Sequence, residues 1–211
     1  CVNVGCIPKK LMHKAALLRE SFEDAKSFGW KVPNNITHSW ESMVGSVQDH
    51  IASLNFGYKT ELRSRNVTYF NERATFVGPN KIVCTDSHGR AREVTARCFI
   101  VAVGGRPKYP GVPGDKECCI TSDDLFSMPR APGKTLVVGA SYVALECAGF
   151  LTGLGYNTTV MMRSIPLRGF DQECAEKICD NMELRGTTFL RKCVPKSFEK
   201  DKSKGGVIAS W

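Results

Sequence analysis

The amino-acid sequence predicts an α/β protein, and three observations lead to that fold class. Apolar residues recur at helical spacing in two early stretches. Short apolar runs separated by turn residues follow and are typical of strands. From residue 134 the pattern alternates strand, glycine turn, helix and strand, which is one βαβ unit and predicts parallel strands.

Two helices are expected first. The spacing of apolar residues predicts a helix over 7–25, where Pro8 suits the first turn. A loop is expected over 29–38, and a longer helix follows Ser39, whose hydroxyl suits an N-cap. The apolar stripe of this second helix is expected to pack in the core, and it consists of Trp40, Val44, Val47, Ile51, Leu54 and Tyr58.

Short strands are expected next, over 67–70, 74–77 and 81–85, as a small antiparallel meander. The stretch 93–103 ends in a continuous apolar run, which fits a strand buried on both faces. Proline and glycine are then frequent over 106–133, so a domain boundary is expected near residue 105.

The second half is predicted to alternate strands and helices. A short helix is expected at 121–124, where the polar side chains cap the helix. The βαβ unit occupies 134–163, and a helix over 171–186 and a strand over 187–192 follow.

Composition narrows the class of protein. The net charge is +8, but the 29 basic residues are spread along the chain, which predicts a solvated surface and no nucleic-acid partner. No apolar run approaches the roughly 18 residues of a membrane span, so no membrane partner is expected. The ten cysteines are too sparse for a disulfide scaffold, and several lie in apolar runs, which indicates buried thiols in a reducing compartment. No metal site is expected.

The segment from Gly139 to Ala144 is a variant of the dinucleotide-binding turn. Gly139 allows the tight turn and Ala144 is small enough for helix–strand packing, whereas Ser141 stands in place of the second glycine. A strand before it and a helix after it place a helix N-terminus where a pyrophosphate could bind. The alternative is a tight βα turn without a ligand.

The end of the next strand indicates which nucleotide would bind. Arg163, Ser164 and Arg168 lie where a carboxylate would bind a ribose 2′-hydroxyl, and two arginines suit a 2′-phosphate instead. NADPH is therefore favoured over NADH. The alternative is that both arginines are simply solvated.

Two cysteine pairs share the spacing C-x4-C. Cys174 and Cys179 lie in a helical pattern, where residues five apart do not share a face, so they are expected to be unpaired. Cys1 and Cys6 flank an irregular stretch, and Cys6 is expected at a helix N-terminus near Lys9, which favours a thiolate. The alternative is two incidental thiols.

The segment CVNVGCIPKKLMH resembles the redox-active disulfide segment of the flavoprotein disulfide reductases. The segments GKTLVVGASYVALECAGFL and RSIPLRGFDQ resemble the high-molecular-weight thioredoxin reductases, including thioredoxin–glutathione reductases. This resemblance runs from Cys1 to about Lys192. It implies a flavoprotein with two dinucleotide-binding domains, one for FAD over 1–105 and one for NADPH over 106–211.

The resemblance also implies roles for individual residues. Cys6 would lie against the isoalloxazine of FAD, Cys1 would exchange with the next disulfide, and Lys9 would pair with Glu146 near the flavin. Tyr142 would cover the nicotinamide. The residues implied to contact FAD are Gly5, Cys6, Ile7, Pro8, Lys9, Arg73, Ala74, Val103 and Gly104. The residues implied to contact NADPH are Lys108, Ala140, Ser141, Tyr142, Val143, Ala144, Leu145, Glu146, Arg163, Ser164 and Arg168. Val103 departs from the threonine of the family, which puts one flavin contact in doubt.

The implied activity is NADPH-dependent reduction of thioredoxin by a homodimer, and a mitochondrial location is favoured over a cytoplasmic one. Glutathione reductase and thioredoxin–glutathione reductase remain alternatives, as does a nucleotide-binding module without catalysis. The resemblance further implies an internal piece of a longer enzyme that is inactive alone, with a first FAD-binding βαβ unit before Cys1. The rest of the NADPH domain, a dimerisation domain and a redox-active tail would follow residue 211.

Overall fold

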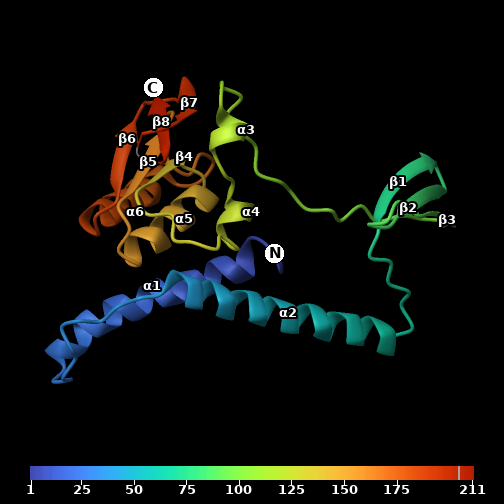
Figure 1. Cartoon of the computed structure of the whole chain (residues 1–211), viewed down its shortest axis with the longest axis horizontal. Helices are drawn as coiled ribbons and strands as arrows, with labels where there is room; N and C mark the ends of the chain where they lie inside the picture. The colour runs from blue at the N-terminus through green and yellow to red at the C-terminus, as the bar shows by residue number, and fades with distance from the viewer. Residues whose placement is uncertain (204) are drawn as a thin grey trace. The chain divides into compact units, whose positions relative to one another are not determined.

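The computed structural model describes residues 1–203 and 205–211 (Figure 1). The chain forms two compact units, one made of 1–52 together with 107–211 and the other of 53–106.

A three-stranded parallel sheet forms the centre of the first unit (Figure 1). Its strands, in spatial order, are β4 (Thr135–Val138), β5 (Thr158–Met162) and β6 (Thr188–Arg191). Helix α5 (Tyr142–Gly153) connects β4 to β5, and α6 (Gln172–Leu184) connects β5 to β6. The pairing begins with Thr135 opposite Thr158. The predicted α/β class and its βαβ unit are therefore confirmed.

The two predicted N-terminal helices are present as α1 (Cys6–Ser27) and α2 (Trp40–Ser64). Ser39 caps α2, because its Oγ accepts a hydrogen bond from the Ser42 N–H at 3.1 Å. Helix α1 packs closely on α5: a Cβ added to Gly153 would lie 2.8 Å from the Cβ of Ala16. The glycine therefore lets the two helices approach.

The core of the first unit lies between α1, the first half of α2 and α5. The indole of Trp40 donates a hydrogen bond to the Met128 carbonyl at 2.8 Å and meets Tyr156 edge to face. The buried members of this core are Met12, Ala16, Trp40, Val44, Val47, Ile51, Leu125, Phe126, Cys147, Phe150, Leu151 and Leu154. The predicted stripe of α2 is thus buried through Ile51, whereas Leu54 is half-buried and Tyr58 is exposed.

Two short helices and a hairpin complete the first unit. They are α3 (Asp115–Cys118), α4 (Ser122–Leu125), β7 (Ser197–Lys200) and β8 (Val207–Ser210). Thr121 and Asp124 form a reciprocal capping box at the start of α4, as predicted for its polar residues. Gly114 precedes α3 with a φ of 80° and leaves no room for a Cβ beside the carbonyl of Phe198.

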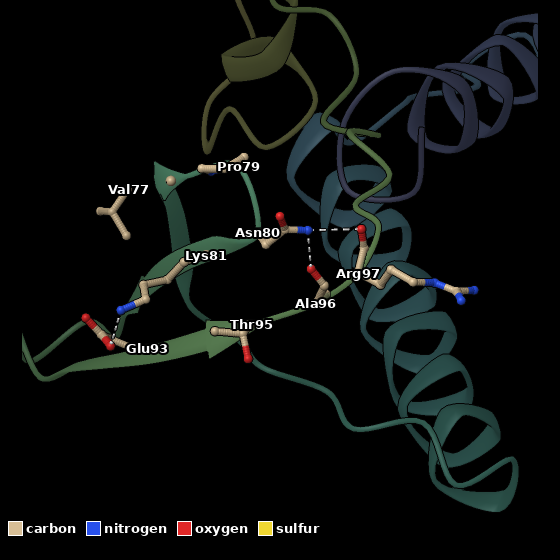
Figure 2. A pocket seen from close by; sticks show the side chains of 9 residues that line it. Val77, Pro79, Asn80, Lys81, Glu93, Thr95, Ala96 and Arg97 are labelled. Carbon is tan, nitrogen blue, oxygen red and sulfur yellow. Dashed lines mark hydrogen bonds and ion pairs between the residues drawn. The ribbon is translucent and has the colours of Figure 1, made fainter.

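The second unit contains a three-stranded antiparallel meander, and two of its strands lie at the predicted residues 74–77 and 81–85. Its strands are β1 (Arg73–Gly78), β2 (Lys81–Thr85) and β3 (Ala91–Thr95). An open pocket of about 710 Å³ lies beside the β1–β2 turn (Figure 2). There the Asn80 amide donates to the carbonyls of Ala96 and Arg97 at 3.0 and 3.1 Å. This side chain fastens the chain that leaves β3 to the turn.

Two predicted strands of this unit are wrong. Residues 67–70 have no regular secondary structure, and Val67 and Tyr69 are exposed. The apolar run that ends 93–103 is strand only as far as Thr95, and Ile100 is 93% exposed. A strand buried on both faces needs covering layers. Within 53–106, all of which the structure describes, no strand pairs with the chain beyond Thr95.

The predicted boundary near 105 lies close to the junction of the compact units at residues 106 and 107. However, residues 1–52 cluster with 107–211, so the compact units do not coincide with the predicted division into 1–105 and 106–211. That division concerns which cofactor each part binds, and it stays a prediction. Among the described residues, no helix has the length and apolar character of a membrane span.

Candidate active site

Cys1 and Cys6 form a disulfide at the start of α1, with their Cα atoms 4.6 Å apart. Gly5 has a φ of 93°, which lets the chain reverse just before the helix. The reversal is held by the Ile7 N–H, which donates to the Cys1 carbonyl at 3.0 Å. Both half-cystines are exposed.

Lys9 and Glu146 form an ion pair between α1 and α5, with 2.8 Å between Nζ and Oε1. Their side chains are 26% and 39% exposed, so this is a half-buried pair. The pairing implied by the family resemblance is therefore present. It fixes a lysine ammonium less than one helical turn from Cys6 and ties the disulfide helix to the helix that follows the glycine turn.

Cys147, the neighbour of Glu146, differs chemically from the disulfide pair. Burial raises the pKa of its thiol to about 12; the Glu146 carboxylate adds to this and the Lys9 ammonium opposes it. A thiol with that pKa stays protonated at neutral pH and is a poor nucleophile. Cys147 therefore belongs to the core and not to the reactive set.

The glycine turn joins β4 to α5. Gly139 has a φ of 125°, and its N–H donates to the Met161 carbonyl at 2.9 Å. A Cβ added to Gly139 would lie 3.8 Å from that of Ala144, so the close packing depends on small residues at both positions. Ser141 occupies the N-cap of α5, yet its side chain makes no capping hydrogen bond. The first N–H groups of α5 are thus available to an anion, as a pyrophosphate requires.

The loop after β5 presents Arg163, Ser164 and Arg168 to solvent. Arg168 donates from Nη2 to the Ser164 hydroxyl at 2.7 Å, so two of the three predicted side chains are already in contact. The Leu167 N–H donates to the Ala140 carbonyl at 2.8 Å and ties this loop to the glycine turn. Both features lie at the carboxyl ends of neighbouring parallel strands, where nucleotides bind in such sheets.

The residues of this set fit a 2′-phosphorylated dinucleotide. The α5 N-terminus suits its pyrophosphate, and two arginines and a hydroxyl suit its terminal phosphate. Ala140 and Leu145 pack in a second apolar cluster under the turn, around Val160 and Met162. Tyr142 and Val143 are exposed at the start of α5, where the implied nicotinamide contact remains a prediction.

Five other predicted site residues lie in other segments of the chain. Lys108 is exposed in the segment before α3. The remaining four belong to the 53–106 unit: Arg73 and Ala74 lie in β1, and Val103 and Gly104 lie in the exposed segment after β3. Their implied contacts with FAD stay predictions. In the part of the chain that the structure describes, no cluster of three or more His, Cys, Asp or Glu could hold a metal ion.

Sequence reasoning missed two supporting residues. Gly153 allows the contact between α1 and α5, and a glycine inside a helical pattern could have indicated it. Gln172 donates from Nε2 to the carbonyl of Phe170 at 3.0 Å, and its bonds to this loop have no signature in the sequence.

Comparison with known proteins identifies the family of this chain. The family model described as pyridine nucleotide-disulphide oxidoreductase matches residues 1–210. Thioredoxin reductase SEP1 of Emiliania huxleyi is 56% identical over 211 residues, which is 100% of this chain and 42% of the relative. The chain therefore spans less than half the length of that relative.

A solved structure with a similar fold is the Cu(II) complex of the HOCl-induced flavoprotein disulfide reductase RclA from Escherichia coli. The two share 16% sequence identity with a TM-score of 0.80, over 99% of this chain and 45% of the other. At that identity the likeness shows the fold alone. The family match over nearly the whole chain, together with the close relative, shows that this chain belongs to the pyridine nucleotide-disulphide oxidoreductase family.

Proposed function

We propose that the protein containing this chain is an FAD-dependent thioredoxin reductase that takes its electrons from NADPH. The observation that carries the proposal is the Lys9–Glu146 ion pair, since it joins the helix that bears the exposed disulfide to the helix that follows the nucleotide turn. The name of the 56% identical relative supports thioredoxin as the acceptor. Homodimerisation and a mitochondrial location belong to the same proposal, and only the family resemblance supports them.

The chain would supply a redox-active sulfur pair and the charge around it. FAD and NADPH supply the hydride chemistry when they are bound. The Cys1–Cys6 disulfide would accept two electrons and two protons, drawn from NADPH and the solvent, and become two thiols. The Cys1 thiolate then attacks the acceptor disulfide, Cys6 displaces the product dithiol, and the Cys1–Cys6 disulfide forms again. Lys9 and the N-terminus of α1 lower the cost of the Cys6 thiolate.

The preference for NADPH would come from the loop after β5. Arg163 and Arg168 are exposed and always charged, and Ser164 already accepts a hydrogen bond from Arg168. A 2′-phosphate would add charge-assisted hydrogen bonds to this set, whereas the ribose hydroxyl of NADH would find no carboxylate among residues 163–168.

The redox role is tested by Cys6→Ser in the full-length protein, with Cys98→Ser as a control at an exposed free cysteine. NADPH-dependent reduction of thioredoxin is expected to fall at least about a hundredfold in the first variant, because the covalent route is lost, and to stay within about twofold in the second. Unchanged activity of Cys6→Ser would contradict the assignment. Activity with glutathione disulfide but not with thioredoxin would identify a glutathione reductase instead.

The nucleotide assignment is tested by the double variant Arg163→Ala, Arg168→Ala. The Michaelis constant for NADPH is expected to rise about tenfold or more, while that for NADH changes less than about twofold, because only NADPH carries the phosphate. Equal changes for both nucleotides would contradict binding of the 2′-phosphate by these arginines.

A further inference from the structure

Gln172 is the first residue of α6, and its side chain turns back toward the loop that carries Arg163, Ser164 and Arg168. Its amide Nε2 donates to the Phe170 carbonyl at 3.0 Å and makes longer contacts with the carbonyls of Pro166 and Leu167, at 3.4 and 3.5 Å. One side-chain amide therefore contacts three backbone carbonyls of the same loop.

Pro166 of this loop is buried, and the residue after it has a strained backbone. Leu167 has a φ of 44°, a left-handed conformation that is unfavourable for a branched side chain such as leucine. Two backbone hydrogen bonds maintain it: the Leu167 N–H donates to the Ala140 carbonyl at 2.8 Å, and the Phe170 N–H donates to the Leu167 carbonyl at 3.0 Å. The Gln172 amide neutralises the carbonyl dipoles that this turn brings together.

The position of Arg168 depends on this turn. Arg168 directly follows the strained Leu167 and reaches back to the Ser164 hydroxyl at 2.7 Å. Long exposed arginine side chains lose conformational freedom when they bind, and a preformed loop reduces that loss. A loop that is already folded therefore presents its guanidinium and hydroxyl as one phosphate-binding set.

We propose that Gln172 is a positioning residue that sets the preference for NADPH over NADH by holding the loop 163–171 in its phosphate-binding shape. The inference deepens the proposed function and rests on the assignment of that loop to the 2′-phosphate. Gln172 itself does not touch the nucleotide. Its removal therefore weakens recognition of the phosphate and leaves recognition of the rest of the nucleotide unchanged.

The test replaces Gln172 by methionine in the full-length protein, because methionine has the same length and a similar helix propensity but no donor. Binding of adenosine 2′,5′-bisphosphate and of AMP is measured by titration calorimetry. The dissociation constant of the bisphosphate is expected to rise about three- to tenfold, the range for loss of one hydrogen-bonded anchor, while that of AMP changes less than twofold. Equal weakening of both ligands, or no change in either, would overturn the proposal.

The matched control is Gln48→Met. Gln48 also donates from its amide to a backbone carbonyl, that of Phe126 at 2.9 Å, but it lies in α2. This variant is expected to leave the binding of both ligands unchanged although it loses a similar hydrogen bond. A loss of bisphosphate binding as large as that of Gln172→Met would show that the effect is a general loss of stability. If Gln172→Met does not fold, Gln172→Ala is measured in its place by the same criteria.

A second measurement separates positioning from a purely structural role. In an Arg168→Ala background, Gln172→Met is expected to change bisphosphate binding by less than about twofold, because the side chain that it positions is gone. An undiminished effect in that background would contradict positioning through Arg168. If Arg163→Ala and Arg168→Ala leave bisphosphate binding intact, the nucleotide assignment itself fails; if they weaken it and Gln172→Met does not, only the role of Gln172 fails.

Discussion

The cysteine pairs Cys1/Cys6 and Cys174/Cys179 have the same spacing but differ in chemical state. The first pair forms an exposed disulfide, whereas Cys174 is an exposed free thiol and Cys179 a buried one. Five residues along a regular helix turn the second side chain well away from the first. Only the first pair has a glycine in the left-handed region between its members, Gly5 with a φ of 93°. The local backbone, and not the spacing, decides which cysteines can meet.

The largest expected effect is on the rate of thioredoxin reduction when the first cysteine of each pair is replaced. Cys1→Ser should lower thioredoxin reduction at least about a hundredfold, since the sulfur that exchanges with the acceptor is lost. Cys174→Ser, at an equally exposed position in α6, should leave the rate within about twofold. The measurement is NADPH oxidation coupled to thioredoxin. Equal losses of activity in both variants would contradict a specific role of the Cys1 sulfur in disulfide exchange.

Buried thiols should respond to alkaline pH. The pKa of Cys147 is raised to about 12 from the ordinary 9.0, mainly by burial, and burial also raises that of Cys179. The Cys147 thiol holds its proton more tightly in the folded state than in the unfolded state. Its titration therefore leaves the free energy of unfolding unchanged below pH 9 and lowers it as the pH rises from 9 toward 12. Between pH 8 and pH 10, the free energy of unfolding should fall about 1 kcal/mol more in the wild-type protein than in Cys147→Ala. Urea unfolding at the two pH values measures it, and parallel losses would contradict it.

The smallest effect concerns the turn that allows the first pair to form. Gly5→Ala forces a side chain into a left-handed conformation and should disfavour closure of the disulfide by about 1 kcal/mol or slightly more. In a glutathione redox buffer this shifts the Cys1–Cys6 equilibrium about five- to tenfold toward the thiols. Gly45→Ala is the control, because Gly45 lies within α2 with open space around it. An equal shift of the disulfide equilibrium in Gly45→Ala would contradict a specific role of the Gly5 backbone in closing the disulfide.

The sequence predicted the parts of the fold whose signals are local. The βαβ unit and the N-cap at Ser39 follow from neighbouring residues, and the structure has both. The run before Gly104 was predicted to be a buried strand, but hydrophobicity alone cannot supply the strands that must pair with it. The Lys9–Glu146 contact joins residues 137 positions apart, so only a family resemblance could indicate it. Gln172 acts through backbone carbonyls, which any residue offers and no sequence pattern reveals.

The glycine at position 153 has a consequence for how this protein can be altered. Helix α5 begins at the nucleotide turn and, through Gly153, lies directly against Ala16 of the helix that carries the disulfide. The contacts that α5 makes with α1 at Gly153 and at Glu146 therefore set the position of the nucleotide turn relative to the helix that carries the disulfide. Transfer of the sulfur pair together with the nucleotide turn into another protein would have to include both α1 and α5, with glycine kept at position 153.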